Sequence, residues 1–137
     1  MVNQGIWLAL LPIMGVILGA ALQHYFSRNL ESRKQLALKK SEAYVDYFRA
    51  VALLAQHAGD KATLAMAADA KVRICMYGSP LVIKRLGDFE RAGARTDSTQ
   101  SEFILMALLK EMRKDTGASD SMIEQEELHR VLFRQTT

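Results

Sequence analysis

The sequence predicts an all-α protein, with one N-terminal transmembrane helix that continues into a stalk and then an irregular cytosolic helical bundle. Three observations support this fold class. The stretch from Ile6 to Leu22 has no charged side chain, and the run from Ser27 to His57 contains neither Gly nor Pro. No later segment alternates with the period of two that is typical of a strand. We therefore expect helices throughout the chain.

The apolar stretch from Ile6 to Leu22 has the length of a membrane span. As an α-helix it rises about 26 Å, and extending it from Trp7 to Phe26 gives about 30 Å, the thickness of a bilayer core. Trp7 and the Tyr25-Phe26 pair fall where aromatic side chains meet the interface, and Pro12 predicts a kink. A cleaved signal peptide is the alternative, but the first five residues lack the basic side chain with which such peptides begin.

A basic cluster follows the span and sets its orientation. Its members are Arg28, Arg33, Lys34, Lys39 and Lys40, against Glu31 alone. The positive-inside rule places this side in the cytoplasm, so we expect a single-pass protein of the bacterial inner membrane with its N-terminus outside. We also expect these five side chains to lie at the membrane surface, near the anionic headgroups of the lipid bilayer.

The charge balance bears on partners. The whole chain has a net charge of +3, and residues 28–40 contribute five positive charges and one negative, or +4, so that residues 41–137 sum to −1. A nucleic-acid-binding domain needs a basic stripe of its own. Nucleic acid is therefore not an expected partner.

We divide the chain into a transmembrane anchor (residues 1–27), a basic juxtamembrane stalk (28–42) and a cytosolic helical domain (43–137). Cys75 is the only cysteine, so no intrachain disulfide can form, which suits a reducing cytosol. We expect Cys75 to be a small buried residue.

The elements follow in order. The run from residue 27 to 57 predicts one long helix, exposed at first and then entering the bundle, which ends at Gly59-Asp60. Its apolar stripe consists of Leu36, Ala43, Tyr47, Ala50 and Leu54, widened by Tyr44, Val45, Phe48, Val51 and Leu53. The next helix is expected over residues 61–77, with Leu64, Ala67, Ala68, Val72, Cys75 and Met76 on its inner side.

Gly78-Ser79-Pro80 is the sharpest boundary in the chain. Gly78 ends one helix, Ser79 is a predicted N-cap, and Pro80 suits the first helical position. The short helix over residues 80–91 is expected to point Leu81, Val82, Leu86 and Phe89 inward. Residues 93–98 form a polar loop.

Two capping boxes predict the last two helices. Thr99 to Glu102 is expected to begin a helix that ends near Arg113-Lys114, before Gly117, and Ser121 to Glu124 is expected to begin the final helix. The inward side chains are Phe103, Leu105, Met106, Leu109 and Met112 in the former, and Met122, Ile123, Leu128, Val131, Leu132 and Phe133 in the latter. We expect both faces to pack with Tyr47, Val51 and Leu54.

Motifs that carry chemistry are few. Glu126 and His129 match one half of a di-iron Glu-x-x-His pair, but the sequence contains no second copy, so we interpret Glu126 as part of an acidic first turn. Neither His24 nor His57 has a Cys or His at the spacing of a metal site. We expect no catalytic residue, no cofactor and no metal.

A GxxxG pattern lies inside the span. Gly15 and Gly19 remove side-chain bulk from one helix face, which lets two membrane helices approach closely. The sequence therefore predicts a homo-oligomer that depends more on the span than on the cytosolic domain.

The chain resembles a group of small bacterial inner-membrane proteins of uncharacterised function. The resemblance rests on the span with its basic exit, on Tyr77 to Val82, on Leu109 to Gly117 and on Leu128 to Phe133. These stretches are structural and imply no reaction. More distantly, the layout is similar to membrane-anchored HEPN-like accessory proteins of RNA-targeting CRISPR systems, which form oligomeric membrane assemblies.

HEPN nucleases place four to six residues between an Arg and a His. The nearest pair here, Arg49 and His57, has seven. This departure argues against nuclease activity.

The sequence thus favours a non-enzymatic, membrane-anchored oligomeric scaffold or recruitment protein, with a further, unidentified protein partner. Two alternatives remain at this stage. One is a membrane-perturbing or pore-forming effector, for example one that acts in phage defence, although the span has no polar stripe to line a wide channel. The other is a degenerate HEPN-like protein that binds or cleaves RNA.

Overall fold

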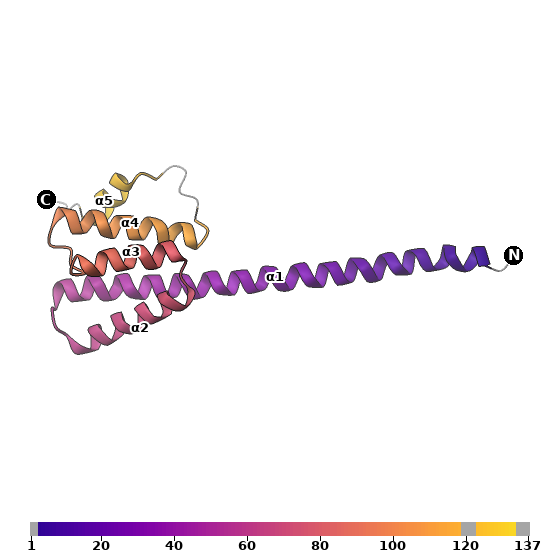
Figure 1. Ribbon diagram of the computed structural model, residues 1–137, viewed down its shortest axis with the longest axis horizontal. Coiled ribbons are helices and arrows are strands. Elements are labelled where there is room, and N and C mark those ends of the chain that lie inside the picture. Colours follow the sequence, from indigo (N-terminus) through magenta and orange to yellow (C-terminus); the bar gives the residue numbers. More distant parts are fainter. Residues whose placement is uncertain (1–2, 119–122, 134–137) are drawn as a thin grey trace. The chain divides into compact units, whose positions relative to one another are not determined.

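The computed structural model describes the backbone of residues 3–118 and 123–133 and, within these ranges, the side chains from residue 15 onward. The described residues form five α-helices and no strand, which confirms the all-α class (Figure 1). The helices are α1 (Asn3–Gln56), α2 (Lys61–Tyr77), α3 (Pro80–Arg91), α4 (Thr99–Asp115) and α5 (Gln125–Phe133). The long continuous helix that the sequence predicts is α1.

The chain divides into two compact units, Met1–Gln35 and Leu36–Thr137. The boundary falls inside the stretch that the sequence assigns to a stalk, residues 28–42. Within the residues that the structure describes, no helix is both long enough and apolar enough to cross a membrane. The side chains of residues 6–14, which include Trp7 and Pro12, lie outside the described residues.

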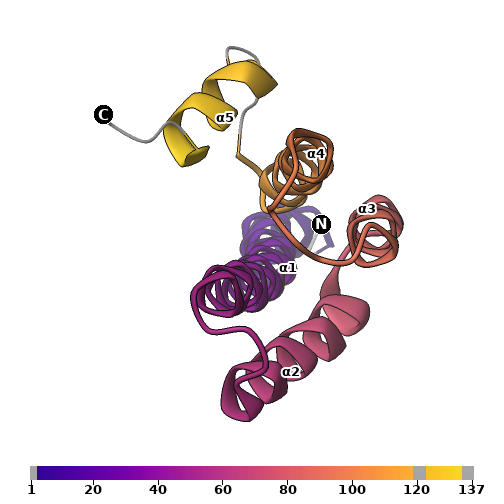
Figure 2. The same cartoon turned by 90° about the vertical axis from the view of Figure 1, so that its left-hand side faces the viewer.

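The second unit is built around the C-terminal part of α1. In Figures 1 and 2, this part of α1 lies between α2 on one side and α4 and α5 on the other, and α3 lies beside α4. The core contains side chains from the first four helices: Ala43, Tyr44, Tyr47, Val51, Ala70, Ile74, Val82, Leu86, Phe89, Leu105, Met106, Leu108 and Met112. Leu128 and Phe133 of α5 are partly buried against it. Four helices therefore share one core, and α5 covers part of it.

Caps fix the boundaries of α2 and α3 at the residues that the sequence predicts. Gly59 has a φ of +87°, a left-handed conformation that suits glycine at the end of α1. Asp60 then accepts a hydrogen bond from the backbone N–H of Thr63 at 2.9 Å. Ser79 caps α3 in the same way by accepting from the N–H of Val82, with Pro80 in the first turn.

The predicted capping boxes need correction. The N-cap of α4 is Ser98, which accepts from the N–H of Ser101 at 3.2 Å, so Thr99 is already helical. Glu102 is then one position too far along to complete a capping box. The helix ends as expected, with Gly117 at a φ of +86°. The last helix begins at Gln125, and Ser121 and Met122 lie outside the described residues.

The predicted inner faces are only partly right. In α2 the buried residues are Thr63, Ala67, Ala70 and Ile74, so the predicted face was wrong except for Ala67. Cys75, expected to be buried, is exposed. The prediction was also wrong for five other side chains, which are exposed: Val45, Leu81, Phe103, Val131 and Leu132. Tyr47, Val51, Leu105, Met106 and Met112 are buried as predicted, whereas Leu54 and Leu109 are half-buried.

Candidate functional site

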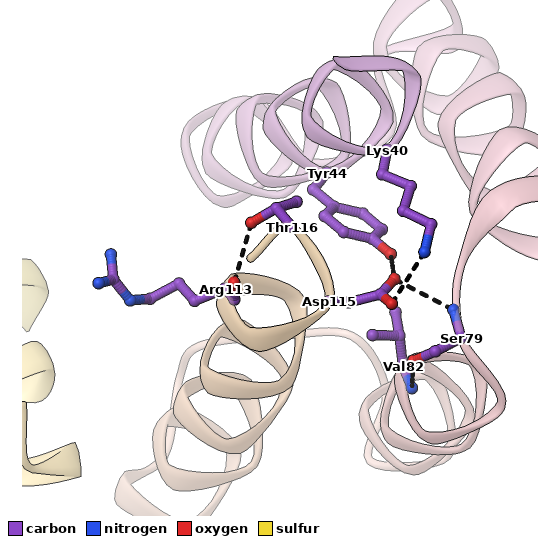
Figure 3. Close-up of polar contacts among 7 residues, drawn as sticks. All are labelled: Lys40, Tyr44, Ser79, Val82, Arg113, Asp115 and Thr116. Carbon is purple, nitrogen blue, oxygen red and sulfur yellow. Dashed lines mark hydrogen bonds and ion pairs between the residues drawn. The ribbon is translucent and has the colours of Figure 1, made fainter. Parts of the chain in front are cut away.

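The carboxylate of Asp115 is the centre of a polar cluster that joins three helices (Figure 3). Asp115 is the last residue of α4, and its two oxygens accept from Lys40 Nζ at 2.9 Å, from the hydroxyl of Tyr44 and from the backbone N–H of Ser79 at 3.1 Å. Lys40 and Tyr44 lie four residues apart on α1 and therefore share one face of it. The cluster fastens the end of α4 to α1 and to the start of α3.

The environment fixes the protonation states in this cluster. Burial raises the pKa of Tyr44, and the hydrogen bond to Asp115 and the negative charge of that residue raise it further. Burial by itself would raise the pKa of Asp115, but the hydrogen bonds from Tyr44, Lys40 and the Ser79 N–H outweigh it and lower that pKa. Asp115 is therefore charged and Tyr44 neutral near pH 7, which suits a structural junction.

A second carboxylate, that of Glu90, joins α3 to α1 and α2. Its oxygens accept from the hydroxyl of Tyr47 at 2.7 Å and from Lys71 Nζ at 3.2 Å. Burial raises the pKa of Tyr47, with Glu90 adding to the shift through its hydrogen bond and its charge. This pair of contacts holds both flanking helices at the same level of α3.

A cavity of about 520 Å³ lies next to Glu90, between the end of α1, the first half of α2 and the loop after α3. Its wall is largely apolar, including Val51, Leu54 and Ala67. The charged side chains in the wall are paired, since Lys71 contacts Glu90 and Arg95 contacts Asp97 at 2.9 Å. The charged groups of the wall are therefore paired with one another, and the Tyr47 hydroxyl, which donates to Glu90, stays protonated because burial raises its pKa.

His129 lies on the line where α5 meets α4. Its Nε2 is 2.7 Å from the carboxylate of Glu102, and its ring stacks on Phe103 with centroids 5.4 Å apart. Phe133 covers the other side at 5.2 Å. In the described part of the chain no three His, Cys, Asp or Glu side chains are grouped so that they could hold a metal. The Glu-x-x-His match therefore brings His129 to Glu102 of another helix.

The predicted membrane-surface residues fall into two groups. Arg28, Arg33 and Lys34 are exposed on the part of α1 that belongs to the first unit. Lys39 lies 5.6 Å from the ring centre of Tyr77, and Lys40 is only 14% exposed because it contacts Asp115. The sequence carried no signal for these two contacts, because the partners are 38 and 75 residues away, at Tyr77 and Asp115.

The predicted HEPN-like pair is placed on the surface at the end of α1. The guanidinium of Arg49 lies 3.7 Å from Asp46, one turn earlier, and is 60% exposed. His57 is exposed just after the helix ends. Arg49 therefore takes part in a surface ion pair within its own helix.

The first unit exposes a continuous apolar surface on α1. Gly15 and Gly19 have open space where a side chain would begin. The exposed large side chains are Val16, Ile17, Leu18, Leu22, Tyr25, Phe26 and Leu30. Consecutive residues point about 100° apart on a helix, so Val16, Ile17 and Leu18 face three directions. Residues 15–22 are therefore apolar all round.

The fold and these sites define an all-α protein with one helical bundle and one exposed apolar helical segment. Comparisons with protein-family models, with curated proteins and with solved structures give no match.

Proposed function

We propose that the chain is a non-enzymatic, membrane-anchored scaffold or recruitment protein of the bacterial inner membrane. In this proposal the first part of α1 is the anchor, its N-terminus lies outside, and residues 36–137 carry the assembly surfaces on the cytoplasmic side. The observation that carries the proposal is the exposed apolar surface of α1 between Val16 and Phe26.

The free energy of burial supports an anchoring role for this surface. Removing one large apolar side chain from water is worth about 1.5–3 kcal/mol, so the six between Val16 and Phe26 give roughly 9–18 kcal/mol. The first charged residue of the chain is Arg28, and Arg33 and Lys34 follow. This order matches an apolar segment that ends at a cytoplasmic membrane surface rich in anionic lipid.

The polar clusters support a role in assembly rather than in a reaction. Three polar groups make hydrogen bonds to side chains of a neighbouring helix: Asp115, Glu90 and His129. These bonds hold the helices together. A catalytic group needs a reactive atom that faces a substrate. The geometry of these three groups suits a rigid domain.

Membrane extraction tests the anchor. The full chain should stay in the membrane pellet after an alkaline carbonate wash, whereas a variant with Ile17→Asp and Leu18→Asp should be released, because each charge at the centre of a span costs about 3 kcal/mol. The matched control is Val45→Asp, an equally exposed position on the second part of the same helix. Release of the unaltered chain would contradict the anchor.

The orientation has its own test. Alkaline phosphatase or a fluorescent protein is fused after Thr137. We expect a fluorescent fusion and an inactive phosphatase, and the reverse pattern would overturn the proposed orientation.

Self-association through the anchor is part of the proposal. The open space at Gly15 and Gly19 lets a second helix approach the backbone of α1 closely. Gly15→Ile with Gly19→Ile should reduce crosslinking of the detergent-solubilised full chain, because the added side chains keep two helices apart. A variant that still crosslinks like the unaltered chain would mean that another surface makes the oligomer.

A further inference from the structure

The cavity beside Glu90 is a slot between two helices that run in opposite directions. The chain turns back at residues 57–60, so that α2 returns along the end of α1 (Figures 1 and 2). The wall uses one face of each helix, at spacings of three and four residues: Tyr47, Val51 and Leu54 on α1, and Leu64, Ala67 and Lys71 on α2. Its volume of about 520 Å³ lies within the range of about 300–1,000 Å³ that is typical of small-molecule sites. We call this cavity the α1–α2 slot.

The α1–α2 slot is polar at one end and apolar at the other. Glu90 contacts both Tyr47 and Lys71, so these two side chains mark the same level of the slot. Leu54 and Leu64 each lie seven residues from that level along their helices, about 10 Å nearer to the turn between α1 and α2. A linear molecule with a polar group at one end therefore matches the slot.

The protein covers the apolar end of the slot only in part. Leu64 is 48% exposed and Leu54 is half-buried, although both line the cavity. Val51, one turn nearer to the polar end, is 7% exposed. A ligand in the slot would remove the two leucines from water, which is favourable in proportion to the apolar area that it covers.

The loop that borders the slot contains a strained residue. Ala94 has a φ of +50°, in the left-handed region that residues other than glycine rarely adopt. Its N–H donates to the carbonyl of Phe89 at 3.0 Å, and its side chain packs against the core. These contacts hold the backbone in this conformation and bring residues 94–97 into the wall of the cavity. Strained backbone of this kind occurs preferentially at ligand sites.

The charges in the wall cancel one another. Lys71 is paired with Glu90, and Arg95 is paired with Asp97. The Tyr47 hydroxyl stays neutral because burial raises its pKa. An ionised ligand would therefore bring a charge without a counter-charge into a largely apolar cavity, whereas an uncharged ligand would not. The charge balance favours an uncharged ligand.

The ion pair at the polar end retains hydrogen-bonding capacity. A carboxylate offers about four acceptor positions, and Glu90 uses one for Tyr47 and one for Lys71. An ammonium group carries three N–H donors, and Lys71 directs one of them to Glu90. A hydroxyl or amide group of a ligand can thus accept from Lys71 and donate to Glu90 while the ion pair stays intact.

We propose that the α1–α2 slot binds an uncharged amphiphile, a linear aliphatic molecule with one hydroxyl or amide group. The polar group lies at Lys71 and Glu90, and the aliphatic chain extends between Leu54 and Leu64 toward the turn after α1. The apolar contacts drive binding, and the polar group fixes the direction of the chain. This binding goes beyond the scaffold role and does not depend on the anchor, because the whole slot belongs to the second unit.

Protection of an introduced thiol measures the binding. Ala55 is an exposed residue of the wall, so a reagent reaches the thiol introduced by Ala55→Cys. Cys75 is exposed outside the wall and serves as the internal control. The full-length variant is reconstituted in vesicles of neutral lipid, and the rate of alkylation of each thiol by a maleimide is followed by mass spectrometry. We expect 1-octanol to slow alkylation at position 55 and not at Cys75.

Three probes with the same chain length isolate the role of the polar group. They are 1-octanol, octanoate and octylammonium, compared at equal free concentration near pH 7. We expect 1-octanol to give half-protection at a concentration about tenfold lower than either charged probe does, because each charged probe brings an uncompensated charge into the slot.

Two substitutions should change this preference in opposite directions. Glu90→Gln keeps an acceptor for Tyr47 but leaves one net positive charge in the wall, so octanoate should become the preferred probe. Lys71→Gln leaves one net negative charge, so octylammonium should become the preferred probe. Both substitutions are made in the Ala55→Cys chain.

A matched pair of substitutions on α2 tests the apolar end. Leu64→Asp places a charge in the wall and should raise the half-protection concentration of 1-octanol about tenfold. Val72→Asp makes a similar change at an exposed position of the same helix outside the wall, and should leave that concentration unchanged.

Four results would overturn the proposal. They are no protection by 1-octanol, equal protection of both thiols, a charged probe that protects the Ala55→Cys chain as well as 1-octanol does, and equal effects of Leu64→Asp and Val72→Asp. Circular dichroism checks that each charge variant is folded. An unchanged order of probes in folded charge variants also contradicts the proposal, and where such a variant is unfolded, the order of probes on the Ala55→Cys chain decides. If the chain does not bind vesicles, the anchor fails, and the same series in solution decides the ligand site.

Discussion

The two parts of α1 carry similar apolar side chains but differ in what covers them. In the first unit Val16, Ile17 and Leu18 are all more than half exposed. In the second unit Tyr47, Ala50 and Val51 are buried under the other helices. The same contrast holds for tyrosine, since Tyr25 is 66% exposed and Tyr47 is 1% exposed.

This contrast shows that the apolar content of a helix does not decide its burial. A large apolar side chain gains about 1.5–3 kcal/mol only when some other group removes it from water. For the second part of α1, α2 to α4 supply that group within the chain. In the first part, the large apolar side chains from Val16 to Leu30 are exposed. The predictions below test the contrast with paired substitutions.

The largest effect is expected for tyrosine truncation in the two parts of α1. Tyr47→Ala removes a buried ring and the hydrogen bond to Glu90, which should cost about 3–5 kcal/mol of unfolding free energy. Tyr25→Ala should change it by less than about 0.5 kcal/mol. Thermal unfolding of the full chain in detergent, followed by circular dichroism, checks this at roughly 4–8 °C for each kcal/mol. Equal shifts in melting temperature for Tyr47→Ala and Tyr25→Ala would contradict the difference in burial between the two parts of α1.

A smaller effect sharpens the role of α4 as the cover of α1. Leu108 is fully buried and Leu109, the next residue, is half-buried at the edge of the core. Leu108→Ala should cost about 2–5 kcal/mol, and Leu109→Ala should cost less because part of its side chain is already in water. Chemical denaturation gives both values. A larger loss of unfolding free energy for Leu109→Ala than for Leu108→Ala would mean that α4 buries the side that carries Leu109 and not the side that carries Leu108.

Asp115 tests the polar junction between α4 and the second part of α1. Asp115→Asn should cost about 1–3 kcal/mol near pH 7, because Lys40 then lacks its charged partner. The pKa of Asp115 is lowered on folding, so its contribution is complete above the ordinary value of 3.8 and is lost as the pH falls through the lower folded-state value. The melting temperatures of the two proteins should therefore converge below that pH. A constant difference from pH 7 to pH 2 would mean that the charge does not contribute.

The smallest effect is expected from removing one hydroxyl group. Tyr44→Phe deletes the hydrogen bond to Asp115 and should cost about 1 kcal/mol. The same change at Tyr25, in the exposed part of α1, should have no measurable effect on unfolding. Melting temperatures of the two variants, measured side by side, check the pair. Equal melting temperatures for the two variants would mean that the hydrogen bond from the Tyr44 hydroxyl to Asp115 does not stabilise the fold.

Local signals predicted the elements well. Gly59, Ser79 with Pro80, and Gly117 each ended or began a helix where the sequence placed the boundary, because caps and left-handed glycines act within one turn of their own backbone. The capping box at Thr99 failed for a local reason too, since Ser98 offered an equally good cap one residue earlier. Glu102 was then free to pair with His129, which no sequence pattern indicated.

The sequence by itself determined the all-α class, the bounds of α2 and α3, and an uncharged segment followed by a basic cluster. These features follow from backbone preferences and from the order of charges along the chain. Only the tertiary structure decided which side of α2 is buried and which carbonyl, carboxylate or ring each side chain meets. Lys40 and Asp115 lie 75 residues apart, and α2 has two apolar sides of which only one can face the core. Periodicity reports that a side is apolar, whereas its burial depends on the neighbours that the fold brings to it.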